Sequence, residues 1–332
     1  MNFLDVLITV FFLLILMLPG FILAKTKMLN ENADSVMSVL VLYVCQPALV
    51  FMAFQKTDFS PRLATNMLIV FGLAMAVHLL SILIFSLIFR NKENSKKINC
   101  LKFASVFGNC GYMGLPFLQS LFGATTMSGE VLIYGGVVIS AFNFLTWSLG
   151  VYIMTGDKKQ INVKNALINP TVIALILGIL VFFTAKVQLV NLAQQNTILD
   201  KSIEGLVKSI NFLAEMVTPL AMTVIGVKLA KVSLKQLLLD KWAYVASFNK
   251  LIVVSVITIL LVAFLPIDNV VKYALFFLLS MPSATNTVLF AVRFGGDAQT
   301  GSVFVLLSTL LSILTIPLMF LVMNGIFAIP IA

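Results

Sequence analysis

The chain is a succession of long apolar runs separated by short polar segments. A membrane-spanning helix needs about 20 mostly apolar residues, and ten runs of that kind follow one another with little sequence left for a soluble domain. They cover residues 4–24, 35–55, 64–89, 98–121, 130–155, 165–185, 203–227, 242–265, 271–292 and 299–323. The pattern predicts an all-α membrane protein with ten transmembrane helices.

The composition agrees with this pattern. Apolar residues make up 60% of the chain, charged residues make up 11%, and the mean hydropathy is +1.07, which exceeds the usage of soluble domains. No basic segment precedes the first apolar run, and Asp5 is the first charged residue. Because that run is long enough to span, we expect it to stay as the first helix and not to be cleaved as a signal peptide.

The net charge of +9 is explained by topology. No basic patch with interleaved aromatic residues is present, so we expect no nucleic-acid partner. The loops after the first, third, fifth, seventh and ninth runs carry fifteen lysines and arginines, against six on the opposite side. The side with more positive charge is cytoplasmic in most membrane proteins. We therefore expect a multi-pass protein of the cell membrane, with both termini extracytoplasmic and the lipid bilayer as a partner.

The runs divide into two halves, residues 1–155 and 156–332, with five spans each. An odd number of spans per half forces the second copy to insert upside down. The second run of each half contains a proline, Pro47 or Pro219, and so does the fourth, at Pro116 or Pro282. The intervals are 69 and 63 residues. This matched spacing predicts two inverted five-helix repeats with broken, crossing helices 4 and 9.

The fourth and ninth runs combine proline with glycine and polar residues, in "GNCGYMGLPF" and "LSMPSATNTVLFA". A lone proline in a membrane helix is usually a structural kink, and that alternative stays open for Pro47 and Pro219. A helix interrupted in the membrane leaves about four unpaired N–H groups where its second half begins. We expect the outgoing halves to begin at Pro116 and Pro282. Their positive ends would together attract an anion.

The residues of these two segments are the candidate substrate site. Asn109 and Asn286 rank first, because an amide can donate to a carboxylate without burying a charge. Asn143 in the fifth run is a further candidate, with a helix-to-helix hydrogen bond as its alternative role. The other candidates at the breaks are Gly111, Tyr112, Gly114, Pro116, Pro282, Ser283 and Thr285, and those at the second-helix bends are Gln46, Pro47, Thr218 and Pro219.

Few ionisable residues lie inside the runs, and such residues are functional candidates. Glu215 is the only mid-depth carboxylate and could carry a coupling proton, or could simply bond freed backbone. His78 could titrate or pack as a neutral ring, and Lys250 is expected to extend its ammonium outward to the basic side. Cys45, Cys100 and Cys110 lack metal-type spacing, so we expect no metal or cofactor.

These segments resemble the auxin efflux carrier family, which includes bacterial malate and malonate permeases and plant auxin exporters. The matching motifs are "YVCQPALVF", "FGNCGYMGLPF", "NPTVIALILG", "TPLAMTVIGVKL", "MPSATNTVLFAVRFGGD" and "LLSTLLSILTIPL". The resemblance implies a scaffold of helices 1, 2, 6 and 7, a mobile transport domain of helices 3–5 and 8–10, elevator-type motion and a homodimer. The family's crossover asparagine and prolines fall on Asn109, Pro116 and Pro282. Only "TGDKKQINVK" joins the halves, so auxin is not favoured as the substrate.

The expected function is secondary transport of small organic anions, mono- or dicarboxylates such as malate or malonate. The alternative is a cation-coupled symporter or antiporter of the bile-acid carrier and sodium/proton antiporter fold group, and a passive channel is also possible. Residues 105–120 and 280–292 contain no Asp or Glu, which argues against an antiporter needing carboxylates there. A single histidine excludes HExxH chemistry and GxSxG is absent, so an enzyme is not expected.

Overall fold

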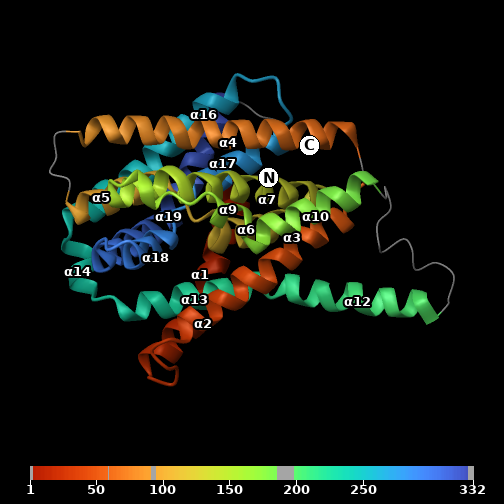
Figure 1. The fold of residues 1–332 in the computed structure, drawn as a ribbon, viewed down its shortest axis with the longest axis horizontal. Coiled ribbons are helices and arrows are strands. Elements are labelled where there is room, and N and C mark those ends of the chain that lie inside the picture. Colours follow the sequence, from red (N-terminus) through yellow and green to blue (C-terminus); the bar gives the residue numbers. More distant parts are fainter. Residues whose placement is uncertain (1–2, 59, 91–94, 185–197, 328–332) are drawn as a thin grey trace.

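The fold was analysed in a computed structural model, which describes residues 3–58, 60–90, 95–184 and 198–327. These residues form helices joined by short non-helical linkers (Figure 1). The first half contains α1 (Phe3–Lys25), α2 (Ala33–Leu40), η1 (Val41–Cys45), α3 (Gln46–Gln55), α4 (Pro61–Ile88), α5 (Lys96–Val106), η2 (Cys110–Gly114), α6 (Leu115–Phe122), α7 (Ser128–Leu145), η3 (Thr146–Gly150) and α8 (Val151–Thr155). The second contains η4 (Lys158–Gln160), α9 (Lys164–Leu167), α10 (Pro170–Thr184), α12 (Ile198–Glu215), α13 (Val217–Lys231), α14 (Leu234–Leu239), α15 (Lys241–Phe248), η5 (Asn249–Val253), α16 (Val254–Ala263), α17 (Asn269–Leu279), α18 (Asn286–Arg293) and α19 (Ala298–Phe327).

Most of the expected spans are long apolar helices. Seven helices in the described residues are long and apolar enough to cross a membrane, and a bent pair of helices adds an eighth candidate span. The seven are Phe3–Lys25, Ala33–Gln55, Pro61–Ile88, Ser128–Thr155, Lys201–Lys231, Lys241–Ala263 and Ala298–Gly325, and the pair is Lys158–Leu167 with Pro170–Phe182, bent by 44°. The chain is therefore a multi-pass, all-helical membrane protein.

The two remaining predicted spans, 98–121 and 271–292, are each split into two short helices. One is divided into α5 and the pair η2–α6, and the other into α17 and α18. The expected starting point was wrong for Pro282, whereas Pro116 does lie in the first turn of α6, which the π-helical turn η2 precedes. The first outgoing half begins at Cys110, six residues before Pro116, and the second begins at Asn286, four residues after Pro282. Pro282 instead lies in the non-helical linker between α17 and α18.

The prolines of the second predicted span in each half do not separate helices. Pro47 lies in the first turn of α3, within one continuous span from Ala33 to Gln55. Directly before it, η1 forms one wide π-helical turn, which gives room for the missing N–H and the bulky proline ring. Pro219 lies near the start of α13, where only Met216 separates α12 from α13. These two prolines are therefore accommodated inside spans and do not end them.

The helix contacts can be divided into two groups, which also contact each other through α3 with α7 and through α1 with α19. In one, α1 lies along α13, and α3 contacts α10 and α12. In the other, α7 packs on α4 and α17, and α19 packs on α15 and α18. Figure 1 places α4 along one long edge and α12 and α13 along the opposite edge. The α1–α13 backbones approach closely, since a Cβ on Gly226 would lie 2.0 Å from the Met17 carbonyl oxygen and one on Gly20 would lie 2.1 Å from that of Thr223. Only glycine fits at these two positions.

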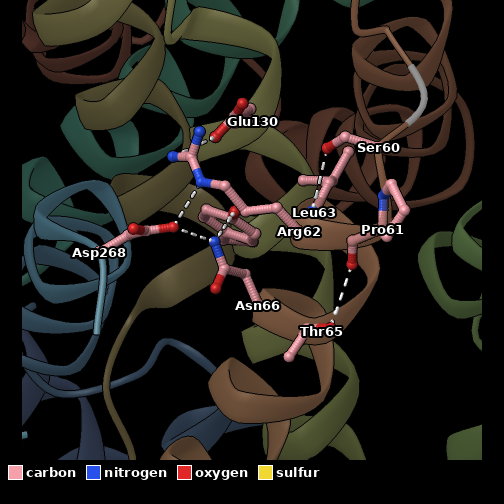
Figure 2. A network of polar contacts seen from close by, with 9 residues as sticks. Ser60, Pro61, Arg62, Leu63, Thr65, Asn66, Glu130 and Asp268 are labelled. Atoms are coloured by element: carbon pink, nitrogen blue, oxygen red, sulfur yellow. Dashed lines mark hydrogen bonds and ion pairs between the residues drawn. The ribbon is translucent and has the colours of Figure 1, made fainter. Parts of the chain in front are cut away.

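A polar network ties the starts of α4, α7 and α17 together (Figure 2). Arg62 Nε donates to Asp268 Oδ2 at 2.6 Å, and the Asn66 amide donates to the same oxygen at 2.6 Å. Arg62 also faces Glu130, with Nη2 3.7 Å from Oε2, and Asn66 donates to the Tyr134 hydroxyl at 3.0 Å. The bonds from Arg62 and Asn66 hold the pKa of the Asp268 carboxyl below its usual value. This network fixes one end of the second helix group.

Candidate functional site

The two interrupted segments meet through their backbones. Asn109 N donates to Pro282 O at 2.7 Å, and Ala284 N donates to Phe107 O at 2.8 Å. These bonds form a short antiparallel bridge between stretches that are far apart in the sequence. The bridge satisfies backbone groups that the helix interruptions leave free, which hydrocarbon could not do. The two breaks therefore face each other, as the sequence pattern predicts.

Ser283 stabilises this meeting point from the side away from the cavity described below. It lies opposite Gly108 in the bridge, and its hydroxyl donates to Ala104 O at 2.8 Å. Its backbone N–H donates to Ser308 Oγ at 3.0 Å. Because its polar groups are occupied inside the protein, Ser283 joins α5, the linker and α19.

Four helix ends converge at this meeting point. The halves η2–α6 and α18 begin here, at Cys110 and Asn286, and α5 and α17 end here, at Val106 and Leu279. A helix carries about half a positive charge at its N-terminus and half a negative charge at its C-terminus. The region thus combines two positive and two negative ends, and the side chains around it decide which sign dominates.

A cavity of about 250 Å³ adjoins the bridge. It lies between the two groups of helices, because its walls come from η1, α3, α9 and α10 on one side and from η2, α7, η3 and α18 on the other. Its polar and aromatic lining residues include Tyr43, Gln46, Asn109, Tyr112, Asn143, Trp147, Asn165, Asn169, Thr171, Thr285, Asn286 and Arg293. Five asparagines and one glutamine among these residues give the wall many neutral hydrogen-bonding groups.

Two buried amide donors in this wall have no partner among the described residues. They are Asn109 Nδ2 and Gln46 Nε2, and their residues are 3% and 1% exposed. The Asn109 side-chain oxygen accepts a hydrogen bond from Tyr112 N at 3.3 Å, which caps the outgoing half-helix. A buried donor without an acceptor is costly, so these two groups indicate that the cavity takes a ligand that accepts hydrogen bonds.

The predicted site residues divide into those that line the cavity and those that do not. Those that line it are Gln46, Asn109, Gly111, Tyr112, Asn143, Thr285 and Asn286. Those outside its lining are Pro47, Gly114, Pro116, Thr218, Pro219, Pro282 and Ser283. The second set shapes the bends and the bridge, as with Pro282, whose carbonyl accepts the Asn109 N–H. The binding roles of the first set stay predictions.

The two candidates for coupling lie away from this cavity. Glu215 is exposed and accepts a hydrogen bond from Asn211 Nδ2 at 2.6 Å. It lines a separate cavity of about 200 Å³ together with Lys56 and Asn211. His78 is buried, with Nδ1 2.7 Å from Ala74 O. A coupling role for either residue stays a prediction.

The expectation for Lys250 was wrong. Its side chain is fully buried, at 0% exposure, and its ammonium donates to Leu279 O at 2.6 Å. It lies against the bridge, because a Cβ on Gly108 would be 3.0 Å from Lys250 Nζ and 3.2 Å from Met281 O. The lysine does not extend outward because η5, a wide turn inside its helix, is held against α5 by a hydrogen bond from Asn249 to Ser105 of 3.1 Å. A positive side chain therefore stands at the meeting point.

Six of the polar and aromatic lining residues named above were not among the predicted ones, namely Tyr43, Trp147, Asn165, Asn169, Thr171 and Arg293. The signal for Arg293 was its position seven residues after Asn286, which places both on one face of α18 two turns apart. Its guanidinium stacks 5.0 Å from the Trp147 ring. Asn169 directly precedes Pro170, and its side-chain oxygen accepts from Thr171 N at 2.9 Å, which caps the start of α10.

Four wide π-helical turns lie around the same region. Gln46 directly follows η1, η2 carries Tyr112, η3 carries Trp147, and η5 carries Lys250. A π-turn inserts one extra residue into a helix and is frequent at functional sites. The four residues come from four separate spans. Gln46, Tyr112 and Trp147 line the cavity, and Lys250 lies against the bridge.

Comparison with known proteins agrees with this geometry. The family model described as "Membrane transport protein" matches residues 5–166 and 154–320. The chain belongs to this family. It corresponds to the auxin efflux carriers that the motifs resemble. Members of this family are transporters, so the protein transports a solute and is not an enzyme.

A curated relative matches along nearly its whole length and has the same general assignment. An uncharacterized transporter of Methanocaldococcus jannaschii is 26% identical over 317 residues. The alignment covers 93% of this chain and 96% of the relative. The similarity therefore extends over both halves, including the interrupted helices and the cavity between the helix groups.

Proposed function

We propose that this membrane transport protein is a secondary carrier of small organic anions, of the mono- or dicarboxylate class that includes malate and malonate. The observation that carries the proposal is the pair of unpaired amide donors, Asn109 Nδ2 and Gln46 Nε2, in the wall of one cavity. A carboxylate supplies acceptor oxygens and no donors, which complements such a pair.

The electrostatics and size of the cavity favour the same ligand class. The outgoing halves η2–α6 and α18 begin at the cavity, with Asn109, Thr285 and Asn286 in its wall. Helix N-termini attract anions. The volume of about 250 Å³ is below the range of roughly 300–1,000 Å³ typical of sites for drug-sized ligands. A solute of a few carbon atoms is therefore the appropriate size.

We further propose that the ten predicted spans form two inverted repeats, residues 1–155 and 156–332. In this arrangement helices 1, 2, 6 and 7 form a scaffold, and helices 3–5 and 8–10 form the transport domain. The two packing groups in the structure support this division. The cavity lies between the groups, with Gln46 and Asn169 on one side and Asn109 and Asn286 on the other. Sliding of one group against the other would carry a bound anion across the membrane by elevator-type alternating access.

The orientation and assembly complete the proposal. Arg293 and Asn165 in the cavity wall belong to the side that carries more positive charge, which predicts that the cavity faces the cytoplasm. The protein would reside in the cell membrane with both termini outside, and the scaffold helices would form a homodimer.

A ligand screen and one substitution test the function. We expect at least one carboxylate of a panel with malonate, malate and acetate to raise the melting temperature of the purified protein, since ligands of the folded state stabilise it. Asn109→Ala should weaken that binding about tenfold, because it removes a hydrogen bond to a charged group. Asn211→Ala, in the separate cavity, should leave the affinity unchanged.

Transport itself is measured in proteoliposomes. Radiolabelled substrate should show saturable counterflow, which a carrier produces and a passive channel does not. Uptake should be the same with and without a sodium gradient, and strict sodium dependence would favour the cation-coupled alternative. An Asn109→Ala variant with unchanged affinity and uptake would contradict the proposed site.

A further inference from the structure

Lys250 is the one fully buried lysine among the residues that the structure describes. It is 0% exposed and lies in η5, near the middle of a predicted span. Its ammonium donates to Leu279 O at 2.6 Å, and the described residues offer it no ion-pair partner. An unpaired charge in the membrane interior is expensive and usually functional.

The position of the ammonium relates it to the helix ends. Leu279 is the last residue of α17, so its carbonyl belongs to the negative end of that half-helix. Gly108, against which Nζ lies, follows two residues after Val106, the last residue of α5. The positive charge is therefore next to the C-terminal end of α17, and at Gly108 it lies between the end of α5 and the start of η2.

The four converging ends largely cancel one another unless two of them are neutralised. With Lys250 charged, the negative ends of α5 and α17 are compensated, and the N-termini of η2–α6 and α18 dominate the potential in the cavity. In a low-dielectric interior, a unit charge just behind the wall acts strongly on a bound anion. Gly108 lines the cavity and also touches the lysine, so only its backbone separates the two.

We propose that Lys250 is the resident cation of the carrier. Its ammonium lies at the negative helix ends, where a co-transported cation would otherwise bind. The site can therefore bind anions without a sodium ion. The inference rests on the proposed function and goes beyond it, because it assigns the sign selectivity to a residue that lies outside the cavity wall. Lys250 is a positioning and electrostatic residue and does not touch the substrate.

The neighbours of the lysine do not supply a competing charge. His78 and Cys110 are the titratable side chains that interact with it electrostatically. The His78 ring packs on Phe107 and Phe142, at centroid distances of 5.7 and 6.4 Å. Cys110 is free and buried. Both are uncharged in their common forms, so they give the lysine no anionic partner.

Two variants separate the charge of Lys250 from its hydrogen bond. Lys250→Met keeps most of the apolar stem and removes both, whereas Lys250→Gln, whose side chain has the same reach as methionine, keeps a donor and removes the charge. We expect both variants to raise the Kd for malonate or malate at least about tenfold, measured by calorimetry at constant ionic strength. The melting temperature of ligand-free Lys250→Met should be unchanged or higher, because replacing a buried charge by an apolar group of similar size is often stabilising.

The remaining outcomes are equally decisive. If Lys250→Gln binds like the wild type and only Lys250→Met is impaired, the hydrogen bond matters and the charge does not, which overturns the inference. Wild-type binding that requires sodium in place of N-methylglucamine also overturns it. If the wild type binds no carboxylate at all, the proposed function fails as well. If it binds one and both variants bind equally tightly, only the role of Lys250 is refuted.

Discussion

At the scale of single residues, the oxygen and the nitrogen of the Asn109 side-chain amide have different roles. The oxygen caps the outgoing half-helix by accepting from Tyr112 N, which directs the nitrogen away from the backbone. The nitrogen, like that of Gln46, has no acceptor among the described residues. A glutamine in one helix group and an asparagine in the other thus offer donors to one ligand. Such a ligand would bridge the two groups.

Arg293 places a positive charge in the lining of the cavity. It lines the cavity two helical turns beyond Asn286, which corresponds to about 10 Å along α18. Its guanidinium is held over Trp147, at 5.0 Å from the ring centroid, so its position is defined by stacking. An anion with two carboxylates could place one at the bridge and the other at Arg293.

We predict that Arg293→Gln distinguishes dicarboxylates from monocarboxylates. The affinity for a dicarboxylate should fall about tenfold, because a charge-assisted hydrogen bond is lost. The affinity for a monocarboxylate should change less than about twofold. Competition binding with malate and acetate measures both. The control is Lys158→Gln, which removes another cation stacked on an aromatic ring, Tyr152, outside the cavity lining. Equal losses for both ligands would contradict a role for Arg293 in selecting dicarboxylates.

At the scale of elements, the α1–α13 pair depends on two close backbone contacts. A methyl group on Gly226 would approach the Met17 carbonyl oxygen to 2.0 Å, and neither backbone can yield without shifting the helix. Side chains larger than hydrogen are therefore excluded from this contact, in contrast to Gly72 of α4, whose added Cβ would meet nothing within 4 Å.

We predict opposite effects of the same substitution at these two glycines. Gly226→Ala should lower the melting temperature, because overpacking costs about 1–3 kcal/mol and exceeds the gain in helix propensity. Gly72→Ala should leave the melting temperature unchanged or raise it, since alanine favours a helix by up to about 1 kcal/mol over glycine. Thermal unfolding in detergent measures both variants. A stable Gly226→Ala protein would show that α1 and α13 can move apart without penalty.

The network around Asp268 gives a pH-dependent contribution to stability. Because the folded protein lowers the pKa of this carboxyl, the network stabilises the fold above the ordinary carboxyl pKa of about 4. Its contribution is lost as the pH falls through the lowered value. The Arg62 and Asp268 side chains are 57% and 37% exposed, so solvent screening limits the effect to about 1 kcal/mol or less.

We predict that Asp268→Asn lowers the melting temperature at pH 7 by a few degrees at most, and that the difference from the wild type shrinks toward pH 3. Thermal unfolding at several pH values provides the comparison. Glu204→Gln serves as the control, because it removes the carboxylate of an exposed pair with Lys208 on one helix and should have no effect at pH 7. A difference that is independent of pH would refute the electrostatic explanation.

At the scale of the whole molecule, the two helix groups meet along α3 and α7 and along α1 and α19. Gly129 at the start of α7 lies directly against Thr57, which follows α3. A Cβ on Gly129 would be 3.3 Å from the Thr57 Cβ. This is slightly shorter than the Cβ separation of about 3.5–4.5 Å in a disulfide, so a small outward shift would allow the bond. Both positions lie outside the lining of the proposed substrate cavity.

We predict that a disulfide between Thr57→Cys and Gly129→Cys stops transport without preventing binding. It would join the proposed scaffold to the proposed transport domain and block their relative movement. Counterflow in proteoliposomes should be lost on oxidation and restored by a reductant, whereas the Kd for the carboxylate should stay within about twofold. Thr57→Cys alone controls for the oxidant, since the native cysteines are buried, whereas a Cβ at Gly129 would clash with the intact Thr57 hydroxyl. Normal counterflow of the oxidised double variant would rule out elevator motion along this contact.

The sequence predicted the fold well where local chemistry decides it. Apolar runs identify spans, because hydrocarbon admits only helices with satisfied backbones. Clusters of glycine, proline and asparagine predicted the breaks near Asn109 and Asn286, because these residues interrupt a membrane helix and free backbone groups that hydrocarbon cannot satisfy. The starting residues of the half-helices were misplaced, since Asn109 and Thr285, not the prolines, precede the outgoing halves.

The sequence pattern could not predict contacts between side chains that are far apart along the chain. Lys250 has the sequence context of a residue that extends to the membrane surface, yet a wide turn and the Asn249–Ser105 hydrogen bond turn it inward. Arg293 and Trp147 lie in different halves of the chain and meet only in the folded protein. Glu215, the only carboxylate expected at mid-depth, is exposed beside Asn211.

By itself, the sequence determined that this chain crosses a membrane many times, that two of its spans are interrupted, and that it belongs with transporters. These properties follow from the composition of contiguous segments. Only the tertiary structure decided which of the polar residues share a cavity and where the buried charge lies. The bridge between the breaks joins segments more than 170 residues apart, as with Asn109 and Pro282. Periodicity along the chain reports only local structure, so it cannot predict such contacts.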